Sequence, residues 1–289
     1  MLELKDICFS VKDKGKVKEI LKKHGFVFKK NLGQNLLTEG SLLRAIVKDA
    51  GVTENDVVVE IGTGAGTLTS AISEKAKWVY TFDVDNALKP VLEETLAGKE
   101  NITLNFLDVL KCSDEKLQDI IGKEPFKVVA NIPYYVTTPL IMRFLESDLP
   151  CKSLTVMVQK EVADRLVADP DTENYGAITL AVELRGKARV TRPVSRMLFH
   201  PAPKVDSAVV HIEIDDTRHN IKDKAFLQKL IRAGFQMRRK TLVNNIGSLL
   251  GISKDRAKEV LVSLGYSESI RGEALSIDDY IKIADALSE

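Results

Sequence analysis

The chain has 289 residues, of which 44% are hydrophobic and 29% are charged, and it contains nine prolines. This length suits one large domain with a smaller one, and this composition excludes a mainly disordered chain. A formal net charge of +1 excludes a polycation, so any affinity for nucleic acid must come from how the charges are arranged.

The charges are unevenly distributed along the chain. Between Arg218 and Lys258 there are eleven Lys or Arg residues and two Asp, and the first 35 residues also carry more Lys than acids. Cys8, Cys112 and Cys151 lie far apart without a CxxC pair, which argues against a disulfide framework or a zinc site. The cysteine spacing therefore leads us to expect no metal. Because neither a signal peptide nor a membrane-spanning apolar run is evident, we also expect a cytoplasmic protein.

Short β-branched runs alternate with amphipathic stretches of helical period. This alternation predicts an α/β domain with a mostly parallel, doubly wound, Rossmann-like sheet and helices on both faces. A later apolar run, after prolines at 193, 201 and 203, predicts a strand that closes this domain. The predicted strands are 57–61, 78–82, 103–106, 128–130, 154–158 and 208–214, and helices are predicted at 67–75, 86–97 and 159–167.

From about residue 217 the pattern becomes helical throughout. Candidate helices at 222–236, 239–250, 253–264 and 276–287 are separated by glycines at 251, 265 and 272. We therefore expect a first domain at 1–216 and a small all-α domain at 217–289.

The first predicted strand runs directly into Gly62-Thr63-Gly64-Ala65-Gly66. Glycines at such a turn let the backbone pass close to a ligand at the carboxyl end of a sheet. The G-x-G-x-G spacing differs from the G-x-G-x-x-G that seats a pyrophosphate, which weighs against NAD. The alternative is a tight turn without a ligand.

Acids follow the next two predicted strands. Asp83 and Asp85 stand where a carboxylate can accept both ribose hydroxyls of an adenosine, and Asp83 is the better candidate because it directly follows the apolar run. Asp108 ends the third strand, although a helix cap explains it equally well. Acids on one rim suit a nucleoside with a cationic tail and no phosphate, which indicates S-adenosylmethionine.

Asn131-Ile132-Pro133-Tyr134 stands where the fourth strand should end. As structure alone, Pro133 stops the strand and Tyr134 covers its edge. As chemistry, the Asn131 side-chain oxygen and the Pro133 carbonyl can accept the two N–H groups of an adenine amine and direct its lone pair. Tyr134 can then stack on the base, while Tyr135 is expected to pack beneath the loop.

Four stretches in this order resemble the ribosomal RNA adenine dimethyltransferases, over residues from about 25 to about 250. The stretch PKVDSAVV favours the branch that dimethylates two adjacent adenosines near the 3′ end of small-subunit (16S) ribosomal RNA. The sister branch methylates large-subunit RNA, gives macrolide resistance and usually lacks that extended stretch. The four stretches are KNLGQNLL at 30–37, EIGTGAGTLT at 60–69, NIPY at 131–134 and FHPAPKVDSAVV at 199–210.

The resemblance implies a role for each matching residue. Cofactor binding is carried over to Asn35 and Leu37 as a cover, Glu60, Gly62 and Gly64 at the turn, Asp83 at the ribose, Asp108 at the adenine amine, and Asn131 at the methyl-transfer end. The family usually has Glu where Asp83 stands, so this contact is one methylene shorter, and Asp85 or a water would assist. Phe199 is implied to face Tyr134 across a flipped adenine, with a core aromatic as the alternative.

Arg238, Arg239 and Lys240 are expected to open a helix and to contact RNA phosphates, with a solvated charged face as the alternative. Together these features predict a monomeric, S-adenosylmethionine-dependent rRNA (adenine-N6,N6)-dimethyltransferase that acts on the small ribosomal subunit during its biogenesis. The alternatives are an assembly or RNA-binding factor with an idle site, and the large-subunit resistance enzyme.

Overall fold

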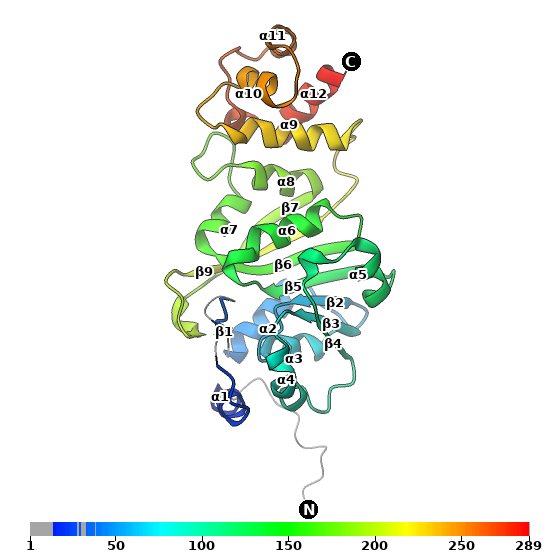
Figure 1. Cartoon of the computed structure of the whole chain (residues 1–289), viewed down its shortest axis with the longest axis vertical. Coiled ribbons are helices and arrows are strands. Elements are labelled where there is room, and N and C mark those ends of the chain that lie inside the picture. The colour runs from blue at the N-terminus through cyan, green and yellow to red at the C-terminus, as the bar shows by residue number, and fades with distance from the viewer. Residues whose placement is uncertain (1–13, 28, 30–32, 38, 289) are drawn as a thin grey trace, which may run out of the picture. The chain divides into compact units, whose positions relative to one another are not determined.

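The computed structural model describes residues 14–27, 29, 33–37 and 39–288 (Figure 1). These residues form two compact units. Unit 1 takes the residues up to Ala163 together with Arg189–Ile214, and unit 2 takes Asp164–Ala188 together with the residues from Asp215 onward. Asp164–Ala188, which the sequence placed in the first domain, thus groups with the C-terminal helices.

Unit 1 contains most of the strands. Its helices are α1 (Lys14–Lys23), α2 (Gly40–Asp49), α3 (Thr67–Ser73), α4 (Lys89–Thr95), α5 (Asp114–Ile121) and α6 (Thr137–Glu146), with 3-10 turns η3 (Asn86–Leu88), η4 (Val109–Lys111), η5 (Tyr134–Val136) and η6 (Arg196–Leu198). Its strands are β1 (Leu36–Leu37), β2 (Val57–Ile61), β3 (Trp78–Asp83), β4 (Ile102–Phe106), β5 (Phe126–Asn131), β6 (Cys151–Gln159), β8 (Phe199–His200) and β9 (Ser207–Ile214). Helix α7 (Lys160–Leu166) and strand β7 (Gly186–Val194) cross between the units.

A seven-stranded mixed sheet organises unit 1, with strand order β4-β3-β2-β5-β6-β9-β7. Strands β4, β3, β2, β5 and β6 run parallel, and β9 runs antiparallel to β6. The predicted α/β fold and all six predicted strands are confirmed. Strand β7 was not predicted, because its residues between Gly186 and Val194 are exposed or half-buried and form no apolar run.

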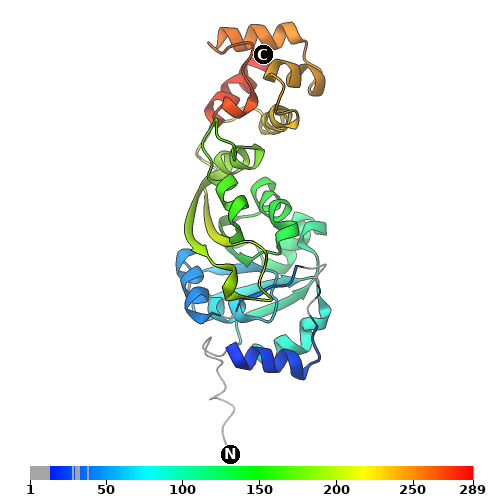
Figure 2. The same cartoon turned by 90° about the vertical axis from the view of Figure 1, so that its left-hand side faces the viewer.

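Helices cover both faces of this sheet. Val58, Val129 and Met157 pack in one core with side chains of α2 and α3. Phe126 meets Phe144 of α6 with ring centroids 6.3 Å apart, and because side chains alternate along β5, Phe126 and Val129 point to opposite faces. Figure 2 shows α2 and α6 on the two sides of the sheet. Strand β3, the next strand in the chain, pairs with β2 on one side, and β5 pairs with β2 on the other. Because the strand order reverses at β2, a crevice opens at its carboxyl end.

Unit 2 is helical, as predicted for its C-terminal part. It contains α8 (Ala177–Arg185), α9 (Lys224–Gln236), α10 (Leu242–Leu249), α11 (Lys254–Ser263), η7 (Gly272–Ala274) and α12 (Ile277–Ser288). Phe235 lies between Tyr175 and Tyr280 in its core, with ring centroids 5.9 and 6.4 Å away. A Cβ at Gly234 would lie 2.0 Å from the Tyr280 hydroxyl, so only glycine fits there.

Two predicted helices begin later than expected. The predicted helix at 239–250 starts at Leu242, because Thr241 caps it by accepting from the Asn244 N–H at 3.4 Å. The predicted helix at 86–97 becomes the 3-10 turn η3 followed by α4. Within the described part of the chain, no helix has the length and apolar character needed to cross a membrane.

Candidate functional site

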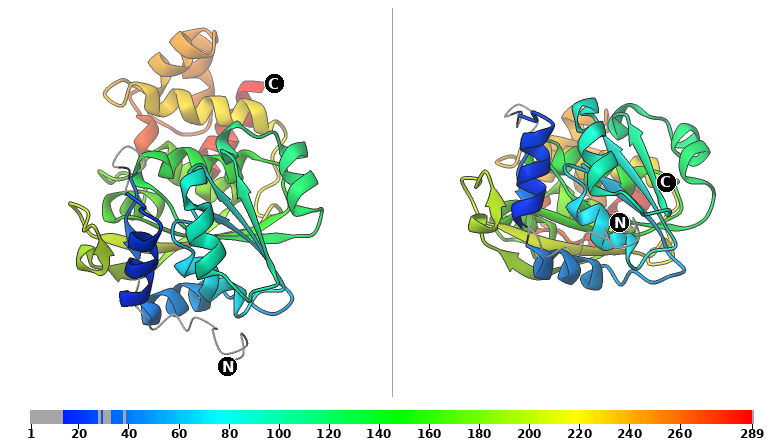
Figure 3. Two further views of the ribbon diagram at one scale, coloured as in Figure 1. Left: turned by 60° about the horizontal axis from the view of Figure 1, so that its bottom comes forward. Right: turned by 90° about the horizontal axis from the view of Figure 1, so that it is seen from below.

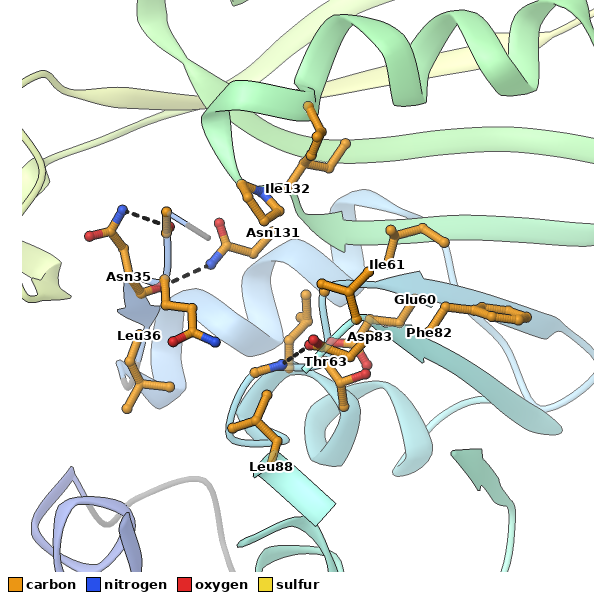
Figure 4. Close-up of a pocket in the computed structure, with 18 of the residues that line it drawn as sticks. Asn35, Leu36, Glu60, Ile61, Thr63, Phe82, Asp83, Leu88, Asn131 and Ile132 are labelled. Carbon is orange, nitrogen blue, oxygen red and sulfur yellow. Dashed lines mark hydrogen bonds between the residues drawn. The ribbon is translucent and has the colours of Figure 1, made fainter. Parts of the chain in front are cut away.

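A pocket of about 210 Å³ lies in unit 1 at the carboxyl end of the parallel strands (Figure 4). Most of its wall is built from the segment 33–37, the glycine turn after β2, and the ends of β3, β4 and β5. The predicted residues that line it are Asn35, Leu37, Glu60, Gly62, Gly64, Asp83, Asp108, Asn131, Pro133, Tyr134 and Phe199. The structure therefore brings the predicted cofactor and base-binding residues of the first domain to one place.

The glycine turn adopts the backbone that its sequence predicts. Gly62, Gly64 and Gly66 have φ values of 81°, 54° and 80°, a region that residues with a side chain rarely adopt. A Cβ at Gly62 would lie 3.4 Å from the Asn131 carbonyl oxygen and 3.5 Å from the Pro133 Cδ. The glycine turn and the turn after β5 are thus in direct contact.

Glu60 is fully buried beside the pocket. Its Oε2 accepts a hydrogen bond from the Thr69 hydroxyl at 2.5 Å, and its Oε1 has no partner among the described residues. Burial raises the pKa of Glu60 to about 8, with a smaller contribution from the nearby Asp83. An unpartnered buried carboxyl oxygen at a pocket wall is suited to accept from a ligand donor.

Asp83 lines the pocket and Asp85 does not. Asp83 accepts from the N–H groups of Gly64 at 3.1 Å and Asp85 at 2.9 Å, and burial is the main cause that raises its pKa. Asp85 is buried and faces Lys29 Nζ at 2.7 Å and Gln34 Nε2 at 2.8 Å. Burial opposes ionisation of Asp85, but these hydrogen bonds outweigh it and lower its pKa.

Asp108 caps η4, where it accepts from the Leu110 N–H at 3.0 Å, and Lys111 Nζ lies 3.5 Å from its other oxygen. The alternative weighed for Asp108, a helix cap, therefore holds in the structure. The same carboxylate also lines the pocket. Because each carboxylate oxygen has two lone pairs, Asp108 can cap η4 and still accept a hydrogen bond from a ligand.

Asn131 ends β5 with its side chain directed toward the segment over the pocket (Figure 4). Its Nδ2 donates to the Asn35 carbonyl oxygen at 3.4 Å. This bond assigns the nitrogen side of the amide to Asn35 and leaves Oδ1 as an acceptor. Leu37 is tied down next to it, because its carbonyl accepts from the Thr67 hydroxyl at 2.8 Å.

The Pro133 carbonyl, predicted as the second acceptor for an adenine amine, already receives two donors. The Val136 N–H lies 3.1 Å away and closes η5, and the Thr137 hydroxyl lies 3.4 Å away. A carbonyl oxygen has two lone pairs, so a third donor must displace one of these contacts.

The aromatic residues divide between the pocket and the core. The Tyr134 hydroxyl lies 2.7 Å from the Ser207 Oγ, which fixes its ring beside the pocket. Phe199 borders the pocket but is only 5% exposed and packs in the core that contains Val209. Tyr135 is 57% exposed and lies over Gly33, so the expectation that it packs beneath the loop is wrong.

The sequence profile of the ribosomal RNA adenine dimethylase family matches residues 25–288. The chain belongs to this family. It is 42% identical to "Ribosomal RNA small subunit methyltransferase A" of Bacillus licheniformis, over 99% of this chain and 98% of that protein, and 42% identical to the protein of the same name from Streptococcus thermophilus, over 96% and 98%. Among solved structures, a dimethyladenosine transferase from Plasmodium falciparum matches with a TM-score of 0.72 and 27% identity, over 86% of this chain and 95% of that one. The 23S rRNA methyltransferase ErmE shares the fold, with a TM-score of 0.66 and 22% identity over 88% and 100%.

As a member of the ribosomal RNA adenine dimethylase family, the protein is an S-adenosylmethionine-dependent rRNA adenine methyltransferase. The pocket fits this cofactor. The unpartnered Oε1 of Glu60 and the glycine turn lie on the same wall as Asp83, so acceptors for an ammonium group and for ribose hydroxyls are present together.

The sequence analysis did not predict helix α1, although this helix and the residues just after it form part of the pocket wall. Leu21 and Phe26 line the pocket, and α1 lies beside α4 (Figure 3), where Lys23 Nζ and His24 Nε2 each lie 2.8 Å from Glu94 Oε2. The apolar spacing of Val17, Ile20 and Leu21 is a helical signal that could have found it. In the stretch KNLGQNLL, residues 30–32 lie outside the described part of the chain.

The predicted phosphate-contacting residues lie in unit 2, on the turn between α9 and α10, and do not open a helix as expected. Arg238 Nε donates to Glu273 Oε2 at 3.1 Å, and its Nη2 reaches the carbonyl oxygens of Glu173 and Tyr175 at 3.3 and 3.4 Å. Arg238 therefore links this turn to η7 and to the segment that precedes α8. Arg239 and Lys240 are exposed.

Proposed function

We propose that the protein dimethylates N6 of two adjacent adenosines near the 3′ end of small-subunit (16S) ribosomal RNA during subunit biogenesis. The observation that carries the proposal is 42% identity over 99% of the chain to a relative named as a small-subunit methyltransferase. The similarity to the 23S rRNA enzyme is limited to the fold, at 22% identity. We expect the enzyme to act in the cytoplasm as a monomer.

In this proposal the pocket residues share the work of holding S-adenosylmethionine. Asn35 and Leu37 cover the cofactor, Gly62 and Gly64 let the backbone approach it, and Glu60 and Asp83 face its amino group and ribose. The support is that Asp83 lines the pocket whereas Asp85 is engaged by Lys29 and Gln34. Asp108 accepts a hydrogen bond from the adenine amine of the cofactor, through a carboxylate lone pair that is not used to cap η4.

Asn131 is proposed to accept an N–H of the target adenine amine through Oδ1. The adenine amine is a poor nucleophile, because its lone pair is delocalised into the ring, and two positioned acceptors favour a pyramidal nitrogen. The bound cofactor supplies an electrophilic methyl group on a sulfonium. The methylated amine then releases its proton to a nearby acceptor or to water, so no strong general base is required.

The second acceptor is a backbone carbonyl of the turn after β5. Pro133 can serve only if the longer contact, the 3.4 Å bond from the Thr137 hydroxyl, is given up. The Ile132 carbonyl, between Asn131 and Pro133, is the neighbouring candidate. Tyr134 is proposed to stack on the target base, because the hydrogen bond to Ser207 fixes its ring. Phe199, which is buried in the core, is proposed to contact the opposite face of the same base.

A nucleoside assay tests the proposal. The purified protein is incubated with undermethylated small ribosomal subunits and methyl-labelled S-adenosylmethionine, and the RNA is digested to nucleosides. We expect N6,N6-dimethyladenosine to accumulate to two residues per subunit. Absence of this nucleoside in the presence of tight subunit binding would instead support an assembly factor with an idle site, and label in large-subunit RNA would support the resistance enzyme.

A further inference from the structure

Tyr135 is an exposed aromatic residue at the mouth of the cofactor pocket, and the proposed function gives it no role. It lines the pocket although it is 57% exposed. Its hydroxyl makes no hydrogen bond to any described residue. A large ring that borders a pocket and keeps so much surface in water is suited to pack on a ligand.

The 3-10 turn η5 separates the directions of its two neighbouring tyrosines. Such a turn has about three residues per turn, so successive side chains point about a third of a turn apart. The Tyr134 hydroxyl lies 2.7 Å from the Ser207 Oγ, on the side proposed for the target base. Tyr135 points to the segment 33–37 instead, because a Cβ at Gly33 would lie 3.5 Å from its Cδ1 and 3.8 Å from its Cε1.

The turn after β5 meets the segment that contains Gly33 at two points. Asn131 Nδ2 donates to the Asn35 carbonyl oxygen at 3.4 Å, and a Cβ at Gly33 would lie 3.7 Å from the Pro133 Cβ. The segment is braced in this position, because Asn35 Nδ2 donates to the Gly33 carbonyl oxygen at 3.2 Å. Tyr135 therefore stands where these two parts of the pocket wall meet.

The charges around Tyr135 indicate which end of the pocket its ring faces. Burial raises the pKa of the Tyr135 hydroxyl, and the Asp108 and Asp83 carboxylates raise it further. Because interactions between charges weaken with distance, the hydroxyl lies toward the end of the pocket that holds both acids. These acids are the ones proposed to hold the adenine amine and the ribose of the cofactor.

We propose that the Tyr135 ring packs on the nucleoside half of bound S-adenosylmethionine and closes the pocket over it. This inference rests on the proposed function, from which it takes the roles of Asp83 and Asp108. Packing on the nucleoside removes exposed aromatic surface from water, which favours the bound state. The spent cofactor keeps the same nucleoside after its methyl group has left, so the ring holds both forms.

Cofactor binding by the full-length protein in the absence of RNA tests the proposal. Isothermal titration calorimetry measures the affinities for S-adenosylmethionine and for S-adenosylhomocysteine. We expect Tyr135→Ala to weaken both affinities about tenfold, the order expected for loss of one aromatic stacking partner. Tyr135→Phe should keep the wild-type affinities, because the hydroxyl makes no hydrogen bond to a described residue. In steady-state methylation, the loss in Tyr135→Ala should appear in the KM for the cofactor rather than in kcat.

A fragment of the cofactor locates the contact. Methylthioadenosine contains the nucleoside but lacks the amino-acid end, so Tyr135→Ala should weaken its binding by the same factor. Wild-type affinity for this fragment, together with a loss for the whole cofactor, would place the ring on the amino-acid half and overturn the proposal.

Tyr80→Ala is the matched control. Tyr80 is a half-buried tyrosine of β3 that does not line the pocket, and its ring lies 6.5 Å from that of Trp78. We expect this variant to keep the wild-type affinities, and an equal loss in both variants would overturn the proposal in favour of general destabilisation.

The remaining outcomes separate this proposal from the proposed function. Unchanged cofactor affinities in Tyr135→Ala overturn the proposal, and weaker binding of small ribosomal subunits by that variant would then assign the ring to the RNA. A wild-type protein that binds the cofactor but forms no dimethyladenosine overturns the proposed function instead.

Discussion

Asn131 is the side chain on which the proposed chemistry depends most directly. Its Nδ2 is held by the Asn35 carbonyl at 3.4 Å, which leaves one oxygen for the adenine amine. Removing a single positioned hydrogen-bonding group from an active site typically slows the chemical step by about 10²–10³-fold.

We therefore expect Asn131→Ala to lower the methylation rate at saturating substrate by about 10²–10³-fold while small-subunit affinity stays unchanged. Single-turnover transfer of labelled methyl groups measures the rate, and filter binding measures the affinity. Asn101→Ala is a matched control, because Asn101 also donates through its amide, to the Ser73 and Ala76 carbonyls at 3.0 Å, away from the pocket. A comparable loss of rate in Asn101→Ala would contradict the assignment.

Glu60 gives a prediction about the pH dependence of stability. Its pKa of about 8 lies above the ordinary value of 4.5 because of burial, so between these values the folded protein holds a proton that the unfolded chain releases. The free energy of unfolding then falls as pH rises from about 4.5 to about 8, by at most about 1.4 kcal/mol per pH unit for one group.

Replacing Glu60 with Gln removes this dependence. We expect the free energy of unfolding of Glu60→Gln, relative to that of the wild type, to increase as the pH rises from 6 to 8.5. Urea unfolding at a series of pH values measures this difference. Equal stability differences at both ends of this range would show that Glu60 ionises normally in the folded protein.

The segment 33–37, with Lys29 before it, is tied to the end of β3 by Asp85. Lys29 and Gln34 both reach this buried carboxylate, and the Asp85 N–H in turn holds Asp83 at 2.9 Å. We therefore expect Asp85 to act as a positioning residue, which affects cofactor binding in the pocket through these neighbours.

We expect Asp85→Asn to raise the KM for S-adenosylmethionine about tenfold with little change in kcat, because weakening charge-assisted hydrogen bonds costs roughly 1.5 kcal/mol. Steady-state kinetics with varied cofactor provide the measurement. Asp56→Asn is the control, since the Asp56 carboxylate pairs with Lys127 Nζ at 2.9 Å at the opposite end of the strands and accepts from the Thr53 N–H at 2.7 Å. A KM that rises equally in both variants would point to a general loss of stability.

The sequence predicted those elements whose buried residues form a local apolar pattern. Val57–Ile61 is entirely buried and apolar apart from Glu60, so it could only be a core strand. Strand β7 carries no such run and was missed. In the site, the motifs located the glycine turn and Asn131–Tyr134, but the two donors on the Pro133 carbonyl and the engagement of Asp85 by Lys29 depend on residues brought together by folding.

The division of the whole molecule was the least predictable from sequence. Tyr175 is fully buried in unit 2, and its hydroxyl donates to the Leu275 carbonyl at 2.8 Å, 100 residues later. Leu180 and Leu184 pack in the same core. No local pattern can reveal that a segment inserted between α7 and β7 completes a core formed by the end of the chain.

A truncation tests this division. A fragment of residues 1–216 keeps Tyr175, Leu180 and Leu184 but loses α9–α12, so it exposes their apolar surface to water. We expect it to aggregate or to bind a hydrophobic dye strongly, whereas the full chain does neither. Size-exclusion chromatography and dye fluorescence measure both, and a monomeric fragment without dye binding would contradict the assignment of Asp164–Ala188 to unit 2.

The hydrogen bond between Asn131 and Asn35 has a thermodynamic consequence. In the proposed function Asn131 faces the target base and Asn35 lies in the segment that covers the cofactor, so immobilising either residue would reduce the conformational entropy that the other still has to lose. We therefore expect the affinities for cofactor and for the flipped adenine to be linked, by the same factor in both directions. Exchange of the spent cofactor after the first methyl transfer should then also loosen the hold on the base.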